Sequence, residues 1–203
     1  MKIDNIIFDL GGVLIDWNPR YVFHKVFDSD EKTEWFLSNI CTMAWNEQQD
    51  AGRSLKDATE QLQKEFPQWH NEIALYYGQW KDMLGGPIID SVDLLSNFKR
   101  NNTYNLFALT NWSSETFPIA LERYDFLSWF QGIVVSGLEK CIKPDRKIYQ
   151  ILLDRYSLTA ENSVFIDDNK RNVAGALSIG MKAIHYKDTP SLKESLSELG
   201  IRI

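Results

Sequence analysis

The sequence IIFDLGGVLID at residues 6–16 guides the interpretation of the whole chain. A short apolar run ends at Asp9, and the paired glycines Gly11 and Gly12 follow directly after Leu10. Apolar runs of this length are typical of parallel strands that are covered on both faces of a sheet. Glycine allows unusual backbone angles and close approach of a ligand to the backbone. The stretch therefore indicates a carboxylate at a strand end, next to a loop that can accept a ligand.

Strands and helices are predicted to alternate through most of the remaining chain. Apolar runs predict strands at residues 5–9, 105–110, 132–136, 163–167 and 182–185. Helical patterns between and after them cover residues 90–100, 115–123, 145–156, 169–178 and 191–199. This alternation predicts an α/β fold with a doubly wound, Rossmann-like parallel sheet and right-handed crossovers.

Residues 17–86 interrupt this alternation. They show no convincing strand, and helix-period patterns cover residues 19–27, 30–40, 55–66 and 68–83. The sequence Gly85-Gly86-Pro87 is typical of a chain leaving such a segment. We therefore predict an α-helical cap at residues 17–86, inserted into an α/β core formed by residues 1–16 and 87–203. The aromatic residues of the cap have helical spacing and are more typical of a cap core than of a ligand platform: Trp17, Trp35, Phe36, Trp45, Trp69 and Trp80.

Composition and charge limit the classes of function. The chain has 203 residues and a formal net charge of −6, with no basic run that would favour nucleic acid or an anionic membrane as partner. No apolar stretch reaches the ~18 residues of a membrane-spanning helix. The two cysteines, Cys41 and Cys141, are too far apart for a redox pair or a zinc knuckle. We expect a cytoplasmic protein that is a monomer or a weak dimer.

Polar side chains follow four of the predicted strands, at the edge where open α/β sheets bind ligands. They are Asp9; Thr110, Asn111 and Trp112; Lys143; and Asp167 with Asp168. Each type alone has an ordinary explanation, because aspartates often cap helices and lysines are usually solvated. Their ordered appearance at four strand ends indicates one site.

These residue types suit phosphoryl transfer. Neighbouring carboxylates repel one another unless a cation is present, and oxygen ligands suit Mg²⁺. Asp9 can hold the metal with one oxygen and attack phosphorus with the other, which forms an aspartyl-phosphate. Thr110 and backbone N–H groups of the glycine loop can bind the phosphoryl oxygens, and Lys143 can neutralise their charge.

The chain resembles the haloacid dehalogenase-like hydrolase superfamily over essentially its whole length. Four motifs carry the resemblance, in order: FDLGGVL, LTN, KPDRKIY and FIDDN. The helical insertion between the first two motifs resembles the small α-helical cap of some members. The resemblance implies a nucleophile at Asp9, a Mg²⁺ site, phosphoryl contacts and a charge-stabilising lysine. The implied metal ligands are Asp9, the Gly11 carbonyl and Asp168, with Asp167 assisting. The implied substrate contacts are Thr110 and Asn111, and we add Gly11, Gly12 and the neighbouring Trp112 to them. The implied lysine is Lys143.

Two positions depart from the family pattern. Most phosphatases of this family have a second aspartate, which serves as general acid and base, where this chain has Gly11, and a threonine where it has Val13. Loss of such a group typically costs 10²–10⁴-fold in rate. Arg20 and His24, one helical turn apart in the cap, are candidates to face the site.

Three interpretations stay open. The first is a Mg²⁺-dependent phosphatase of a small phosphate monoester, similar to sugar-phosphate phosphatases of the α-D-glucose 1-phosphate type, with a small phosphorylated metabolite as partner. The second is a metal-independent 2-haloacid dehalogenase, but those enzymes have serine and asparagine where this chain has Asp167 and Asp168. The third is a non-catalytic protein that binds a phosphoryl ligand.

Overall fold

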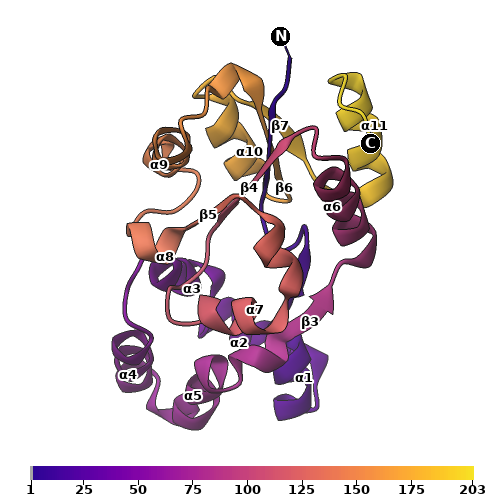
Figure 1. Cartoon of the computed structure of the whole chain (residues 1–203). Helices are drawn as coiled ribbons and strands as arrows, with labels where there is room; N and C mark the ends of the chain where they lie inside the picture. The colour runs from indigo at the N-terminus through magenta and orange to yellow at the C-terminus, as the bar shows by residue number, and fades with distance from the viewer. Residues whose placement is uncertain (1) are drawn as a thin grey trace.

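A five-stranded parallel sheet forms the centre of the computed structural model, which describes residues 2–203 (Figure 1). Its order is β5-β4-β1-β6-β7, with β1 pairing with both β4 and β6. The strands are β1 Asn5–Phe8, β4 Asn105–Thr110, β5 Gly132–Val135, β6 Ser163–Asp167 and β7 Lys182–His185. Each lies within one residue of its predicted range, and the predicted α/β fold class is confirmed.

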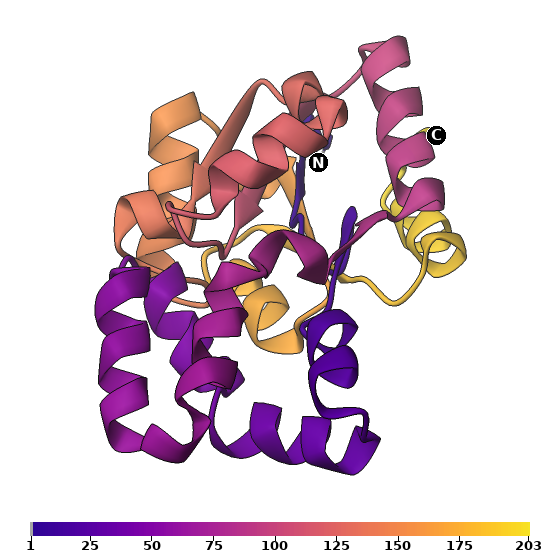
Figure 2. The same cartoon turned by 90° about the horizontal axis from the view of Figure 1, so that it is seen from below.

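Helices cover both faces of this sheet. They are α6 Ile89–Asn101, α7 Phe117–Arg123, α9 Arg146–Tyr156, α10 Lys170–Leu177 and α11 Thr189–Glu198, with the shorter η3 Asp125–Trp129, α8 Ser136–Glu139 and η4 Ala160–Asn162. Neighbouring residues of β1 point to opposite faces: Ile6 packs in the cluster that includes α6 and α11, and Ile7 packs in the one that includes α9 and α10. Both views show α6 and α11 together on one side, away from α9 (Figure 2).

The helical segment between β2 and β3 lies beyond the carboxyl ends of the core strands (Figure 1). Its elements are α1 Arg20–Phe27, α2 Asp30–Asn39, α3 Met43–Asp50, α4 Leu55–Glu65, η1 Pro67–Trp69, α5 His70–Gly78 and η2 Trp80–Met83. Side-chain caps from Ser29, Thr42 and Ser54 fix where α2, α3 and α4 begin. Its apolar core is continuous with one face of the sheet.

Helix α3 and two short strands were not predicted. The buried residues of α3 include Asn46, Gln49 and Asp50, so the helix has no apolar stripe to recognise. Strands β2 Ile15–Trp17 and β3 Leu84–Pro87 pair antiparallel where the chain enters and leaves the helical segment. The prediction of no strand in residues 17–86 was therefore wrong at β3, whose four residues include two glycines and no apolar run.

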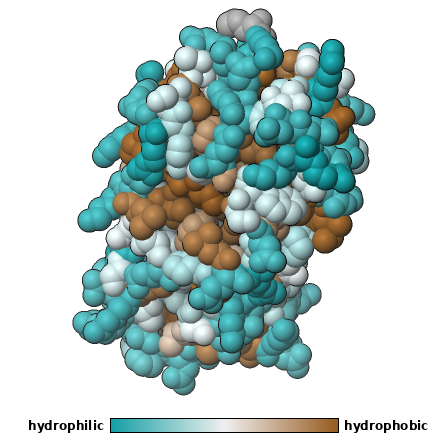
Figure 3. Space-filling view, in the orientation of Figure 1, coloured by the Kyte–Doolittle hydropathy of each residue, from teal (hydrophilic) through white to brown (hydrophobic). Residues whose placement is uncertain are grey.

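Two surface properties complete the description. Within residues 2–203, no helix has the length and apolar character needed to cross a bilayer. Apolar surface gathers across the middle of the molecule in the orientation of Figure 1, while both ends are mostly hydrophilic (Figure 3). The exposed apolar side chains include Leu121 of α7 and Leu138 of α8.

Candidate active site

Asp9 lies at the carboxyl end of β1, in the middle of the sheet. Its backbone N–H donates to the Ile166 carbonyl of β6 at 2.8 Å, which continues the β1–β6 ladder past the last strand residue. Its Oδ1 accepts a hydrogen bond from the Leu10 N–H at 2.8 Å. Burial, together with the charges of Asp167 and Asp168, raises the pKa of Asp9 against the lowering effect of Lys143. The sheet thus places one oriented carboxylate at the head of the site.

Lys143 is buried beside this carboxylate. Its Nζ lies 2.9 Å from Asp9 Oδ1 and 2.7 Å from Asp167 Oδ2, and it donates to the Leu109 carbonyl at 3.0 Å. Burial opposes the charge on Lys143, but the two carboxylates outweigh it and raise the pKa above its ordinary value. Lys143 is therefore a fixed cation next to Asp9.

Asp167 and Asp168 follow each other in sequence but have different surroundings. Besides Lys143, the Asp167 carboxylate accepts from the Asn169 N–H at 2.7 Å and from Asn172 Nδ2 at 3.1 Å. Asp168 is more exposed and lines the cavity, and burial and the charge of Asp167 raise its pKa. One oxygen from each of Asp9, Asp167 and Asp168 can lie within 4.8 Å of the others.

The two glycines have different surroundings. Gly12 has a φ of +73°, and a β-carbon there would lie 2.8 Å from Cγ of Asp168. Its N–H donates to the Ile15 carbonyl at 2.9 Å, so this group closes the loop. Gly11 lies outside the left-handed region, and a β-carbon there would meet no atom within 4 Å. The bare backbone at Gly12 thus provides the space that the Asp168 carboxylate occupies.

The carboxylate oxygens at this site fit a magnesium ion. Asp9 and Asp168 both line the cavity and belong to a cluster of three carboxylates, and the charge of Asp167 helps to raise the pKa of both. Hard oxygen ligands of this kind, with space for water, are what Mg²⁺ requires. Asp167 is already engaged by three donor residues, so its contacts suit orientation of the neighbouring groups.

The second predicted motif supports the lysine loop. Asn111 Oδ1 accepts from the Lys143 N–H at 2.9 Å, and its Nδ2 donates to the Lys143 carbonyl at 3.1 Å. Asn111 and Trp112 line the cavity, whereas Thr110, at the end of β4, is buried and is not part of its lining. Thr110 stays a predicted phosphoryl contact, and Asn111 has in addition a structural role in holding Lys143.

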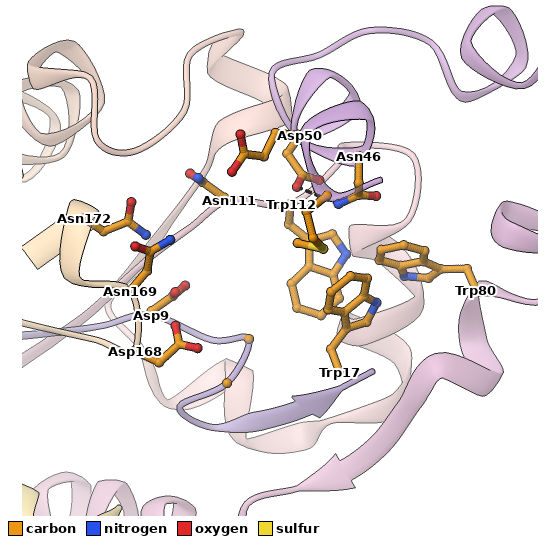
Figure 4. A pocket seen from close by; sticks show the side chains of 14 residues that line it. Asp9, Trp17, Asn46, Asp50, Trp80, Asn111, Trp112, Asp168, Asn169 and Asn172 are labelled. Carbon is orange, nitrogen blue, oxygen red and sulfur yellow. Dashed lines mark hydrogen bonds between the residues drawn. The ribbon is translucent and has the colours of Figure 1, made fainter. Parts of the chain in front are cut away.

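A cavity of about 330 Å³ opens between the core and the helical segment (Figure 4). The core contributes Asp9, Gly11, Gly12, Asn111, Trp112, Asp168, Asn169 and Asn172, and the β2–β3 region with its helices contributes Trp17, Met43, Asn46, Glu47, Asp50 and Trp80. The Trp17 and Trp80 rings pack with centroids 5.4 Å apart. Both tryptophans pack in or against the apolar core, as predicted, and they also form a wall of the cavity.

Sequence reasoning missed the contribution of α3. Asn46, Glu47 and Asp50 lie at i, i+1 and i+4 of this helix, and all three line the cavity. The only available signal was a set of polar residues at helical spacing after the cap residue Thr42. Arg20 and His24, by contrast, pair with Glu34 and Asp30 and do not line the cavity.

Ser136 joins α3 to the core. Its Oγ donates to the Asp50 carbonyl at 2.6 Å and accepts from the Trp112 N–H at 2.9 Å. Both hydrogen bonds are buried. The end of α3 is therefore held directly over the segment that follows β4.

The sequence and the structure were also compared with known proteins. The model of the family described as haloacid dehalogenase-like hydrolase matches residues 6–186. The sesquiterpene phosphatase astK of Aspergillus oryzae is 28% identical, covering 95% of this chain and 94% of its own. A phosphorylated carbohydrates phosphatase of Thermotoga maritima is 26% identical, covering 90% of this chain and 84% of its own.

A similar solved structure agrees in fold. It is a HAD family enzyme of Bacteroides thetaiotaomicron, an aspartate-to-alanine variant in complex with magnesium and inorganic phosphate. The TM-score is 0.69 at 18% sequence identity, and the match covers 94% of this chain and 98% of that chain. At this identity the likeness concerns the fold alone.

Proposed function

The chain belongs to the haloacid dehalogenase-like hydrolases, and we propose that it is a Mg²⁺-dependent phosphatase that hydrolyses a small phosphate monoester through an aspartyl-phosphate on Asp9. The observation that carries this proposal is the arrangement of Lys143 and Asp168 around Asp9. One buried cation lies 2.9 Å from the nucleophile, and one cavity-lining carboxylate has an oxygen within 4.8 Å of an Asp9 oxygen. This combination suits an anionic phosphoryl group.

We propose a task for each residue from its contacts. Lys143 and the Leu10 N–H both contact Oδ1 of Asp9, which leaves Oδ2 as the attacking atom. Lys143 offsets charge on the phosphoryl oxygens, and Asn111 and Asp167 hold Lys143 in place. Mg²⁺ bound by Asp9, Asp168 and the Gly11 carbonyl would supply further positive charge for the phosphoryl group. Water attack on the aspartyl-phosphate then regenerates Asp9.

The cavity wall indicates the organic part of the substrate. Trp17, Trp80 and Trp112 give aromatic surface, and Asn46 adds an amide on the same side of the site. A sugar ring can pack its C–H face on indole and bond its hydroxyls to polar groups. A sugar phosphate is therefore our first candidate, and the carbohydrate phosphatase relative from Thermotoga maritima supports it.

An isoprenoid phosphate is the second candidate. Met43 adds an apolar side chain to the cavity lining, and the fungal relative is a sesquiterpene phosphatase. Methionine and tryptophan together suit a flexible apolar chain.

The other two interpretations have less support. A haloacid substrate carries its own carboxylate, which Asp168 and the neighbouring acidic groups would repel. A protein that only binds a ligand has no need for an oriented carboxylate paired with a buried lysine.

One panel of steady-state assays tests the proposal. It contains α-D-glucose 1-phosphate, geranyl phosphate, p-nitrophenyl phosphate and 2-chloropropionate, each with Mg²⁺ and with EDTA. We expect phosphate release from at least one ester with Mg²⁺ and none with EDTA. Halide release in EDTA would instead identify a dehalogenase, and no turnover of any compound would leave only the binding function.

A further inference from the structure

We propose that Asp50, at the end of α3, is the proton-transfer residue that takes the place of the carboxyl group absent at Gly11. The inference rests on the proposed phosphatase function and adds a catalytic residue to it. Asp50 lines the same cavity as Asp9 and Asp168, and it enters from the wall opposite to them (Figure 4). It is thus placed to meet the leaving-group side of a bound ester.

The Asp50 side chain is held in one orientation by a polar network. Asn46 Nδ2 donates to Asp50 Oδ2 at 3.1 Å, and Asn46 Oδ1 accepts from the Tyr77 hydroxyl at 3.0 Å. Gln49 Nε2 in turn donates to the Tyr77 hydroxyl at 2.9 Å. The Asp50 carbonyl is fixed by Ser136 of the core. Three residues of the helical segment therefore hold this carboxyl group, and Ser136 of the core holds the Asp50 backbone.

Stability does not explain an aspartate at this position. Asp50 is 7% exposed, and no basic group among residues 2–203 lies within 4.0 Å of its carboxylate. It is also the last residue of α3, where the helix dipole disfavours a negative charge. A buried, unpaired carboxylate at a helix C-terminus is unfavourable, and such groups are typical of catalytic sites.

Burial, more than the surrounding charges, places the pKa of Asp50 near neutral pH. Burial is the main cause that raises its pKa, to about 7, and Glu47 on the same helix raises it further. The Ser113 N–H and the charge of Lys143 lower it. From α5, Tyr76 and Tyr77 face it as neutral hydroxyls, since burial raises the pKa of both. A group with this pKa can both donate and accept a proton at pH 7.

The proposed steps balance. Asp9 attacks phosphorus, the bond to the leaving oxygen breaks, and that oxygen takes the proton of the Asp50 carboxyl group. Asp50, now a carboxylate, removes a proton from water as the water oxygen attacks the phosphorus of the aspartyl-phosphate. The bond between phosphorus and Asp9 then breaks, which releases phosphate and leaves Asp50 protonated again. No further reactant is needed.

The experiment compares Asp50→Asn with Glu47→Gln, a change to the other carboxylate of α3 in the cavity lining. Single-turnover rates are measured for an alkyl phosphate and for p-nitrophenyl phosphate, whose leaving group needs little protonation. We expect Asp50→Asn to slow the alkyl phosphate by roughly 10²–10⁴-fold and p-nitrophenyl phosphate by far less. Glu47→Gln should keep the wild-type ratio between the two substrates.

A rescue separates proton transfer from structure. A β-carbon at Gly11 would meet no atom within 4 Å, so Gly11→Asp can be added to Asp50→Asn. We expect the double variant to hydrolyse the alkyl phosphate at least about tenfold faster than Asp50→Asn does. A merely structural role of Asp50 would not predict this recovery. If Asp50→Asn fails to fold, the pH dependence of the wild-type rate still tests the role of Asp50. The single-turnover rate of the wild type should fall above pH about 7 for the alkyl phosphate and not for p-nitrophenyl phosphate.

The outcomes distinguish the two proposals. A wild type that hydrolyses no phosphate ester overturns both the phosphatase function and the role of Asp50. If the wild type is active, three results would overturn the role of Asp50 alone. Asp50→Asn could keep the wild-type ratio of the rates for the two substrates, or Glu47→Gln could be the variant that slows the alkyl phosphate selectively. The pH profiles of the two substrates in the wild type could also coincide.

Discussion

The Asp168 carboxylate lies against the bare backbone of Gly12, where a β-carbon would come within 2.8 Å of Asp168 Cγ. Gly12 is also in the left-handed region, with a φ of +73°. The two glycines after Asp9 therefore have different structural roles. Gly12 is required by the conformation of the loop and by the position of Asp168. At Gly11 neither the backbone conformation nor a neighbouring atom requires glycine.

This difference predicts opposite effects of the same substitution. Gly12→Ala should lower the free energy of unfolding by about 1–2 kcal/mol from backbone strain and displace Asp168, so that Mg²⁺-dependent turnover is lost. Gly11→Ala is the matched control and should keep wild-type stability, because nothing lies within 4 Å of the added carbon. Urea unfolding and turnover of both variants test this. Equal losses in the two variants would contradict it.

The two acidic residues after β6 should differ in what they contribute. We expect Asp168→Asn to weaken Mg²⁺ binding by at least about 10-fold, because it removes a cavity-lining ligand. Asp167→Asn should lower turnover by about 10²-fold through misplacement of Lys143, with a smaller change in Mg²⁺ affinity. Calorimetric titration with Mg²⁺ in the absence of substrate measures the first effect. EDTA-treated wild type gives the baseline, and an equal loss of affinity in both variants would make Asp167 a ligand too.

Asp50 should also leave a signature in stability. Its pKa is raised from 3.8 to about 7 in the folded protein, so between these values the folded state binds more protons than the unfolded state. Stability contributed by this group therefore falls as pH rises from about 4 to about 7, and is constant above that. The total is on the order of 4 kcal/mol.

Asp50→Asn should remove this dependence. Relative to the wild type, the variant should gain stability as pH rises from 4 to 7.5, which urea unfolding at several pH values measures. Asp9 and Asp168 contribute to both proteins and cancel in the difference. Asp93→Asn, a change to an exposed aspartate of α6, is the control and should run parallel to the wild type. A parallel curve for Asp50→Asn would mean an ordinary pKa.

The sequence predicted the core better than the cavity for physical reasons. Strands such as β4 are contiguous apolar runs that a sheet must bury, so the ends of the strands can be predicted from the sequence. The polar residues that come after these ends, Asp9, Lys143 and Asp168, can be predicted with them. Helix α3 buries polar groups, so its pattern resembles a solvated helix until the fold shows what surrounds Asp50. The double role of Trp80 likewise depends on where the helical segment lies against the core.

Contacts between the helical segment and the core predict how the cavity opens. Glu115 Oε1 accepts from the Leu55 N–H at 2.8 Å, and Arg123 Nη1 donates to the Lys81 carbonyl at 2.8 Å. At the base of the segment β2 pairs with β3, and Asp16 lies opposite Gly86. We expect the segment to move as a lid on this ribbon, with the Glu115 and Arg123 contacts as latches.

Glu115→Ala tests the lid. Loss of one exposed hydrogen bond should cost only about 1 kcal/mol, but it should speed hydrogen exchange at the Leu55 amide and raise KM several-fold, with kcat little changed. Glu122→Ala, on the exposed side of α7, is the control and should alter neither. In the wild type, beryllofluoride with Mg²⁺ should increase protection at Leu55 and change it at Gly86, because a phosphoryl mimic on Asp9 favours the closed state. Identical exchange with and without the mimic, together with an unchanged KM in Glu115→Ala, would mean that the helical segment is rigid and that substrate enters by another route.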